Sequence, residues 1–400
     1  MPVFVWKGKN RYGDSVGGER VARSADELSR VLQREQITVS NISKKKGEIN
    51  LPFLQRKKVK LKELAVFSRQ LAVLIDAELP LIQSLNILSQ QTKNRYFKTV
   101  IEEVRGDVEA GSTLNQAMRK HPKVFDDLYC NLVASGEQSG SLDMMLKRVA
   151  EFLENSLKIR SQVKQAMIYP VTIVCFAVLV VLFMMWKVIP VFADVFMELG
   201  AELPFLTVAV LSISEFVQKN ILLVFLGIVG LIVLYRFIRK SRGGKKATDQ
   251  FYLKMPLFGN LLQKVALSRV TRTLSTLLAG GVPMLESLKI TSSTSGNVII
   301  EENVMHSRRL VAEGTSLTDA MKENGHFPFM LVQMVGVGEA TGTLDDMLTK
   351  LANFYDDEVE STVASLLSVL EPILLIFVGG LVGGIVISMY LPIFSLISQL

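Results

Sequence analysis

The sequence has little cysteine and little histidine: two cysteines and three histidines in 400 residues. Cys130 lies in a helical pattern and Cys175 inside an apolar span, so we interpret both as packing thiols. The histidines, His121, His306 and His326, are scattered and show no metal-ligand spacing. The sequence therefore predicts neither a disulfide framework nor a metal centre.

Catalytic and nucleotide-binding motifs are also missing. The basic stretch 242–246 lacks the spacing and the hydroxyl of a phosphate-binding loop, and no Ser/His/Asp or Cys/His set stands out. The acidic run 356–358 is typical of a solvated helix face, and a divalent ion there or at Asp143 is the less favoured alternative. We expect no enzyme, no cofactor and no metal.

The first thirty residues carry many charges and no apolar run, so we expect no secretory signal peptide. Apolar residues nevertheless make up 49% of the chain, beside 21% charged residues. Charge and apolarity are segregated, because three long apolar spans alternate with polar stretches. The net charge of +7 is concentrated next to these spans, which suits membrane association better than nucleic-acid binding.

One motif occurs twice, 202 positions apart. Residues 133–143 read VASGEQSGSLD, and residues 335–345 read VGVGEATGTLD. The matched residues are Gly136, Glu137, Gly140, Leu142 and Asp143 in the first copy, and Gly338, Glu339, Gly342, Leu344 and Asp345 in the second. The chain therefore contains an internal duplication.

The duplication extends far beyond this motif. Arg69 returns as Arg272, and Pro80, which suits the first turn of a helix, returns as Pro283. Apolar residues at helical spacing predict two homologous all-helical bundles, at 61–167 and 239–365. In the first bundle we expect helices at about 95–110, 113–120 and 126–135.

The repeated motif itself predicts a tight helix–turn–helix corner. We expect Gly136 to supply the left-handed residue that ends the first helix. Ser141 is expected to cap the next helix, with Asp143 favourable at its positive end; Thr343 fits the same pattern in the second copy. Glu137 and its counterpart Glu339 have two interpretations: bonding to backbone N–H groups in the corner, or lying on a surface that contacts a partner.

Residues 1–60 differ from the rest and predict a small α+β module followed by a basic linker. Short strands and turns come first, and Ser24 with Glu27 suggests a capping box that opens a helix to about Glu35. Residues 37–42 read as a returning strand. Lysine and arginine at 44–46 and 56–58 form the linker, which is either simply solvated or attracted to anionic membrane lipid.

Three membrane helices are expected, at 168–190, 220–238 and 366–398. Residues 168–186 and 372–398 are uncharged over 19 and 27 residues, enough to cross a bilayer. Pro170 and Pro372 stand where the long preceding helices enter the first and third spans. Glu371 lies at the mouth of the third span, where it is either solvated or paired with a basic group.

Charge predicts the orientation of these spans. The basic cluster after the second span and the lysines and arginine before the first belong on the cytoplasmic side. The connecting segment at 191–219 is expected to be a periplasmic loop, since acidic residues outnumber basic ones there. Both bundles and the N-terminus are then cytoplasmic, and the C-terminus is periplasmic.

The third span contains a cluster of glycines spaced four apart, namely Gly379, Gly380, Gly383 and Gly384. Such spacing lets two helix backbones approach closely. Glycine is also common in membrane helices generally. We favour a helix-packing seam, either within the chain or between chains.

These motifs resemble a known family. The stretches FSRQL at 67–71, LPL at 79–81, GSTL at 111–114 and GEQSGSL at 136–142, with their second copies, resemble the inner-membrane platform proteins of type IV pilus and type II secretion systems (the PilC/GspF family). The resemblance covers nearly the whole chain. One departure is Ala77-Glu78, where the second copy has Gly280-Gly281.

The resemblance implies a non-enzymatic assembly protein of the bacterial inner membrane that forms homo-oligomers. Its implied partners are the hexameric cytoplasmic assembly and retraction ATPases, pilin subunits and other inner-membrane pilus components. The pilus branch is favoured, with type II secretion as the alternative. A channel or transporter is less favoured, because the spans lack internal ionisable residues, and a receptor or an enzyme would need a pocket or catalytic set.

Overall fold

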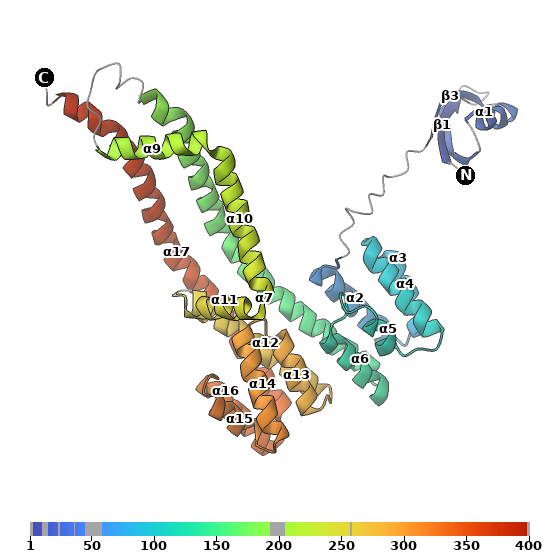
Figure 1. The fold of residues 1–400 in the computed structure, drawn as a ribbon. Coiled ribbons are helices and arrows are strands. Elements are labelled where there is room, and N and C mark those ends of the chain that lie inside the picture. The colour runs from blue at the N-terminus through green and yellow to red at the C-terminus, as the bar shows by residue number, and fades with distance from the viewer. Residues whose placement is uncertain are drawn as a thin grey trace. The chain divides into compact units, whose positions relative to one another are not determined.

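The computed structural model describes residues 3–9, 15–22, 25–35, 37–44, 58–192, 205–256 and 258–397. Its contacts divide the chain into two units, residues 1–57 and 58–400 (Figure 1). The predicted basic linker lies mostly outside the described residues, as does Ser24 with its predicted capping role.

The first unit is a three-stranded antiparallel sheet with one helix. Its elements are β1 (Val3–Lys9), β2 (Ser15–Val21), α1 (Ala25–Arg34) and β3 (Thr38–Lys44). β1 is the central strand in the order β2-β1-β3. Phe4 and Trp6, two residues apart on β1, form a buried cluster with Leu28 and Leu32 of α1, so the helix covers one face of the sheet.

The second unit contains the two copies, each built from six helices in the same order. The first copy consists of α2 (Leu61–Asp76), α3 (Leu81–Gln91), α4 (Arg95–Glu109), α5 (Leu114–Arg119), α6 (Asp127–Ser139) and α7 (Leu142–Phe183). The second consists of α12 (Phe258–Ala279), α13 (Met284–Thr294), α14 (Val298–Ala312), α15 (Leu317–Asn324), α16 (Phe329–Thr341) and α17 (Leu344–Ile397). The predicted duplication of a helical bundle is therefore confirmed.

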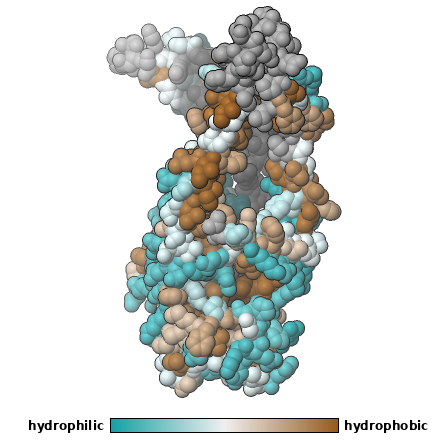
Figure 2. All heavy atoms as spheres, turned by 90° about the vertical axis from the view of Figure 1, so that its left-hand side faces the viewer, coloured by the Kyte–Doolittle hydropathy of each residue, from teal (hydrophilic) through white to brown (hydrophobic). Residues whose placement is uncertain are grey.

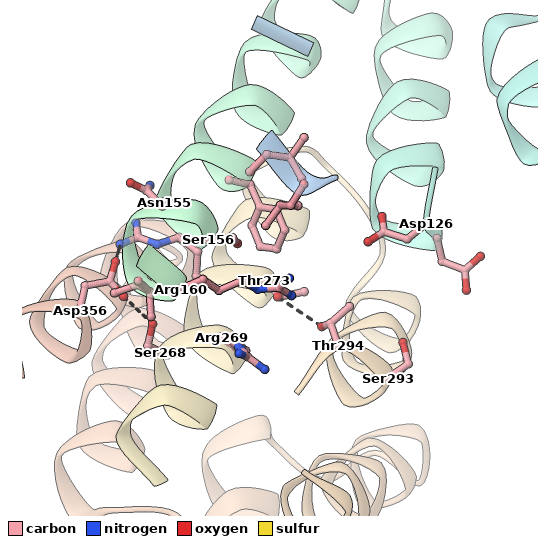
Figure 3. Close-up of a pocket in the computed structure, with 16 residues that line it drawn as sticks. Asp126, Asn155, Ser156, Arg160, Ser268, Arg269, Thr273, Ser293, Thr294 and Asp356 are labelled. Atoms are coloured by element: carbon pink, nitrogen blue, oxygen red, sulfur yellow. Dashed lines mark hydrogen bonds and ion pairs between the residues drawn. The ribbon is translucent and has the colours of Figure 1, made fainter. Parts of the chain in front are cut away.

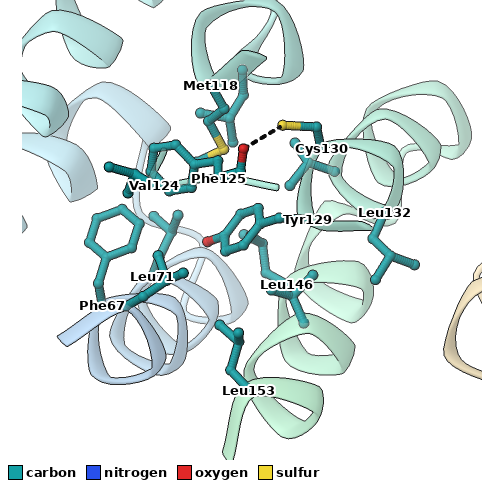
Figure 4. Close-up of a cluster of buried hydrophobic side chains, with 14 of the residues drawn as sticks. Phe67, Leu71, Met118, Val124, Phe125, Tyr129, Cys130, Leu132, Leu146 and Leu153 are labelled. Atoms are coloured by element: carbon teal, nitrogen blue, oxygen red, sulfur yellow. Dashed lines mark hydrogen bonds between the residues drawn. The ribbon is translucent and has the colours of Figure 1, made fainter. Parts of the chain in front are cut away.

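An aromatic cluster forms the centre of the first bundle (Figure 4). Phe67 of α2 packs edge-on against Phe97 of α4, with ring centroids 5.2 Å apart. Phe125 packs in the same way against Tyr129 of α6, at 5.0 Å. The Tyr129 hydroxyl is buried but forms a hydrogen bond with the Ser68 hydroxyl at 2.9 Å, so its burial does not leave an unsatisfied polar group in the core.

The second bundle has a smaller aromatic content and an aliphatic core. Leu267 and Leu274 of α12, Leu331 and Val335 of α16, and Leu351 of α17 are buried together. Leu267 and Leu274 have the same spacing along α12 as their counterparts have along α2. The first helix of each copy therefore packs into its bundle in the same way. Burying a leucine side chain stabilises a fold by about 1.5–3 kcal/mol.

The long helices of each copy continue beyond the bundle. α7 runs without a break into a π-helical turn, η1 (Met184–Val188), and onward to Phe192. α17 spans 54 residues, which corresponds to about 80 Å of helix axis. A bilayer core needs only about 20 residues of helix, so most of each helix lies outside such a layer.

Helices α7 and α17 each carry a segment long and apolar enough to cross a membrane. Figure 2 shows apolar side chains gathered mainly in the upper half of that view, and hydrophilic ones over most of the lower half. Pro170 and Pro372 lie inside the continuous helices and do not begin them. Pro170 is buried, whereas Pro372 is exposed.

The segment between α7 and the second copy is also helical where it is described. It comprises α9 (Phe205–Lys219), α10 (Ile221–Lys240) and α11 (Arg242–Lys254). The segment predicted to be a periplasmic loop, 191–219, thus contains a helix over 205–219. The apolar run that begins α9 packs against the long helices, and the Ser214 hydroxyl of α9 donates to the Met185 carbonyl at 2.5 Å.

Candidate functional site

The repeated motif forms a helix–turn–helix corner in both copies. Gly140 has φ of 71° and ends α6, and Gly342 has φ of 73° and ends α16. Glycine adopts this left-handed backbone without the steric cost that a Cβ would add. The following N–H groups, of Ser141 and Thr343, bond back to carbonyls inside the helix, at 3.0 and 2.9 Å.

Gly136 has a different role from the one that the sequence predicted. It lies inside α6, and Gly338 lies inside α16, so neither residue ends a helix. A Cβ at Gly338 would lie 2.8 Å from the Cα of Leu344, and one at Gly136 would lie 3.0 Å from the Cα of Leu142. These glycines let the two helices of each corner approach closely.

The predicted side-chain caps are wrong in detail. Ser141 stands at the N-cap of α7, but its hydroxyl makes no capping bond and pairs with the Ser139 hydroxyl at 2.6 Å. Thr343 pairs in the same way with Thr341 at 2.7 Å. These bonds bridge the turn from one helix to the next. Asp143 lies in the first turn of α7, as expected, where the helix dipole favours a negative charge.

The motif glutamates bind the N-terminus of a neighbouring helix. The Leu114 and Asn115 N–H groups of α5 donate to the two carboxylate oxygens of Glu137, at 2.5 and 3.0 Å. In the second copy the same bonds reach Glu339 at 2.8 and 3.0 Å, from Leu317 and Thr318 of α15. Both short helices therefore begin on a carboxylate held by the corner.

Glu339 receives one more bond, from the Thr318 hydroxyl at 2.6 Å. Partial burial acts to raise the pKa of Glu339, but these donated hydrogen bonds outweigh it and hold the pKa below the ordinary value. The interpretation of these glutamates as ligands of backbone N–H groups thus has a geometric basis. The N–H groups belong to α5 and α15, however, and not to the corner itself.

The departure from the family pattern at Ala77-Glu78 has a structural counterpart. Glu78 adopts φ of 60°, a left-handed backbone that a glycine would take more readily. Gly281 occupies the same place with φ of 74°. Pro80 and Pro283 follow as the N-caps of α3 and α13.

The second copy contacts the first through this turn. The Ser135 hydroxyl of α6 donates to the Gly280 carbonyl at 2.5 Å, and a Cβ at Gly280 would lie 2.6 Å from a methyl group of Leu132. The side chains of Val282 and Ile290 are buried in the core of the first bundle. Glycine is needed where the turn packs against α6, whereas Glu78 in the first copy is exposed.

An ion pair is repeated between the first and last helices of each bundle. Arg69 of α2 binds Glu154 of α7 through two bonds, of 2.8 and 2.5 Å. Arg272 of α12 binds Asp356 of α17 at 2.5 Å. Glu154 and Asp356 are 202 positions apart, so the internal alignment contained this signal, but the pairing was not predicted. Asp356, within the acidic run 356–358, is thus an ion-pair partner.

The two long helices cross just before their apolar spans. Ile159 of α7 packs into a buried cluster with Val359, Val363 and Leu366 of α17. The Gln162 amide donates to the carboxylate of Glu360 at 2.7 Å. The two copies are therefore joined at a second place, next to the segments that enter the apolar layer.

The glycine cluster of α17 packs against no other part of the chain that the structure describes. A Cβ added at Gly379, Gly380, Gly383 or Gly384 would meet no atom within 4 Å. Glu371, at the start of this segment, is exposed. The alternative of a seam inside the chain thus has no support among the described residues, and the alternative of a seam between chains stays a prediction.

Among the described residues, no group of three or more histidine, cysteine, aspartate or glutamate side chains could hold a metal ion. His121 lies 3.5 Å from Glu103, which is a pair and not a ligand set. The site consists of two helix corners, two helix-to-helix ion pairs, and two long helices leading into apolar spans.

These features define a membrane protein built from a duplicated helical domain. Residues 67–190 and 270–392 match the family described as type II secretion system (T2SS), protein F. The two matched segments correspond to the two copies. The chain belongs to this family, and the resemblance drawn from its motifs is confirmed.

Relatives within the family carry two kinds of name. The chain is 41% identical to the type IV pilus assembly protein PilC of Myxococcus xanthus, over 98% of this chain and 94% of the relative. It is 40% identical to PilC of Thermus thermophilus, over 100% and 99%. It is 33% identical to the type II secretion system protein F of Vibrio cholerae, over 86% and 85%.

Proposed function

We propose that this chain is the inner-membrane platform protein of a type IV pilus assembly machine. The observation that carries the proposal is identity of 39–41% over at least 98% of the chain to three relatives named type IV pilus assembly proteins. Relatives named type II secretion system protein F are 31–33% identical. The platform of a type II secretion system is therefore the second candidate.

The test is deletion of the gene, followed by electron microscopy of surface fibres and an assay of exported proteins. Loss of fibres with normal export, restored by the intact gene, is the expected result. Loss of export with fibres intact would assign the protein to type II secretion. Survival of both processes in a strain without a second copy of the gene would refute the platform function.

The proposed topology has three spans in the inner membrane. α10 supplies the second span, since it is a 20-residue helix that is uncharged up to Arg236 and ends in a basic cluster. Basic residues flank spans on the cytoplasmic side. Both bundles and the N-terminal unit are then cytoplasmic and the C-terminus is periplasmic, which a topology reporter fused after residue 200 or residue 397 would test.

The proposed mechanism is transmission of motion from cytoplasmic ATPases to the bilayer, where pilin subunits are inserted or removed. Each corner is stiffened by its glycine contacts and its glutamate, and leads without a break into a span. A continuous helix carries displacement along its axis better than a jointed one. The N-terminal unit with the first bundle is the proposed ATPase contact.

Inserting a flexible glycine segment beside Lys158 tests this transmission. Lys158 lies on the cytoplasmic part of α7, close to where α7 crosses α17. We expect the variant to fold and insert but to assemble no fibres. The same segment inserted in the linker between residues 45 and 57 is the control. Normal fibres from the Lys158 variant would rule the transmission mechanism out.

We further propose that the glycine cluster of α17 is a contact between copies of the chain. A Cβ at any of these glycines would meet no described atom of the chain within 4 Å, and small residues allow close helix packing in lipid. Gly383→Leu should weaken cross-linking between copies in membranes, whereas Ile376→Leu, at an exposed position of the same span, should not. Equal cross-linking of both variants would contradict the proposal.

A further inference from the structure

A half-buried arginine stands apart from the ion pairs of the bundles. Arg269 of α12 lines a cavity of about 360 Å³ between α7 and α12 (Figure 3). Within the described residues no carboxylate lies within ion-pair distance of its guanidinium. Burial, and then the positive charge of Arg160, lower the pKa of Arg269. A desolvated cation without a counter-ion is costly unless a ligand supplies the charge.

Three aspartates line this cavity, Asp126, Asp127 and Asp356, and two of them are engaged within the fold. Asp356 is paired with Arg272 and with the Ser268 hydroxyl. Asp126 accepts the Tyr129 N–H at 2.9 Å, as the N-cap of α6. Arg160, by contrast, makes no ion pair among the residues that the structure describes. Arg269 and Arg160 thus both line the cavity without an ion pair among the described residues, the first half-buried and the second exposed, and the Asp127 carboxylate, which also lines it, pairs with neither.

The fold of the repeat does not require an arginine at position 269. The offset of 203 that relates Arg272 to Arg69 places Val66 at the equivalent point of α2, and Val66 is exposed. The absence of a side chain at Gly296 also leaves room for the Arg269 guanidinium. Gly296 has φ of 79°, and a Cβ there would collide with the guanidinium. Arg269 and its surroundings are therefore a feature of one copy only.

A second, apolar cavity of about 610 Å³ shares Arg269 as part of its wall. Val163 and Met167 of α7 and Leu262 and Val265 of α12 line its apolar side. Tyr235 and Arg239, at the end of α10, line another part, and Arg239 is paired with Asp249 at 2.9 Å. The two cavities together present a cationic end and an apolar end.

The order of residues along α7 places the polar cavity farther from the apolar span and the apolar cavity nearer to it. Ser156 and Arg160 line the polar cavity, and Val163 and Met167 line the apolar one, all within three turns of one helix. The uncharged span starts at Ile168. Arg160 therefore lies about 12 Å along the axis before the span, which is within reach of a lipid whose chains lie in the bilayer.

We propose that the two cavities form a binding site for one anionic phospholipid. The phosphate lies between Arg269 and Arg160, and an acyl chain follows the apolar wall past Met167 into the bilayer. Guanidinium groups bind phosphate oxygens through paired N–H donors, and basic pockets between membrane helices hold anionic headgroups. A free phosphate ion would use the same arginines but not the apolar wall.

The test uses the full chain, purified and delipidated in a non-ionic detergent, with native mass spectrometry as readout. The probes are phosphatidylglycerol, phosphatidylcholine and inorganic phosphate. We expect saturable one-to-one binding of phosphatidylglycerol, with weaker binding of phosphatidylcholine. Arg269→Gln should weaken phosphatidylglycerol binding by roughly tenfold or more, through loss of charge-assisted hydrogen bonds, and Arg269→Lys should restore part of it.

Arg236→Gln is the matched control, because it removes the same charge from an exposed position beside the α10 span without touching either cavity. It should leave binding unchanged. Leu262→Asn should weaken phosphatidylglycerol binding through the apolar wall. If Arg269→Gln fails to fold, Arg160→Gln replaces it, since Arg160 is exposed.

Two outcomes would overturn the proposal. Equal phosphatidylglycerol binding by the wild type and by the arginine variant would show that the cavity is not the site. Binding of inorganic phosphate that Leu262→Asn leaves intact, without competition by phosphatidylglycerol, would assign the arginines to a soluble anion. Neither outcome depends on whether the chain serves pilus assembly.

Discussion

Removing the charge of Glu137 should loosen α5 by a predictable amount. In Glu137→Gln the side chain keeps one acceptor oxygen and turns an amide towards the second backbone N–H. A charge-assisted hydrogen bond is worth about 1.5–3 kcal/mol, and a neutral one about 1 kcal/mol. With one bond weakened and one N–H left unpaired, the start of α5 should lose about 2–4 kcal/mol of stability. Since Glu137 is half-buried, water can bond the freed N–H and offset part of this loss, and we expect a net loss of about 2 kcal/mol.

Amide hydrogen exchange measured on the full chain gives the local readout. The Leu114 and Asn115 N–H groups, bonded at 2.5 and 3.0 Å, should lose protection by roughly thirtyfold, which corresponds to about 2 kcal/mol. Protection in α3 should be unaffected. A change of less than about threefold at Leu114 and Asn115 would refute the view that the carboxylate holds the start of α5.

The second copy repeats the experiment within the same molecule. Glu339→Gln should release the N-terminus of α15 at Leu317 and Thr318 by a similar or larger factor, because Glu339 also accepts the Thr318 hydroxyl. Glu323→Gln removes the same charge from an exposed position of α15 and should leave these amides protected. Equal effects of both variants would indicate a general charge effect.

Four further substitutions test the turns before α3 and α13, one corner and the ion pair. Glu78→Gly should stabilise the chain by about 1 kcal/mol in thermal unfolding, because φ is 60° there, whereas Gly281→Glu should destabilise it. Gly338→Ala should cost about 1–3 kcal/mol, since its Cβ would lie 2.8 Å from the backbone of α17; unchanged stability would show that the corner relaxes. The hydrogen bond from Arg69 lowers the pKa of Glu154 in the folded state. The pair therefore stabilises the fold at pH values above the pKa that Glu154 has in the unfolded chain, and this stabilisation is lost as the pH falls through the pKa of the folded state. The free energy of unfolding, measured from pH 6 down to about 3.5, should therefore decrease less for Glu154→Gln than for the wild type. The difference should be under about 1 kcal/mol, because both side chains are partly exposed. Parallel curves for the two proteins would contradict this.

Much of the architecture follows from local patterns in the sequence. The duplication could be read from matched motifs, and most bundle helices from apolar residues at helical spacing. Two long helices with apolar spans were predicted from uncharged runs alone. These features depend on neighbours along the chain, so no knowledge of packing is needed to find them.

Other predictions failed because a residue type has more than one use. Gly136 was expected to end a helix, yet a glycine can equally permit close packing inside one, and only the position of Leu142 decides between these. Ser141 was expected to cap α7, but the Ser139 hydroxyl competes for it. Helix α9, within 191–219, was not predicted, because its apolar run packs on helices remote in sequence.

By itself the sequence determined the two copies, their helices and the apolar spans, since periodicity and hydropathy act over a few turns. Tertiary structure alone decided which distant groups meet: Glu137 with the start of α5, Ser135 with the Gly280 carbonyl, and Arg269 with a cavity that Arg160 of α7 also lines. Such contacts depend on how helices dozens of residues apart pack together, and packing is a property of the whole fold.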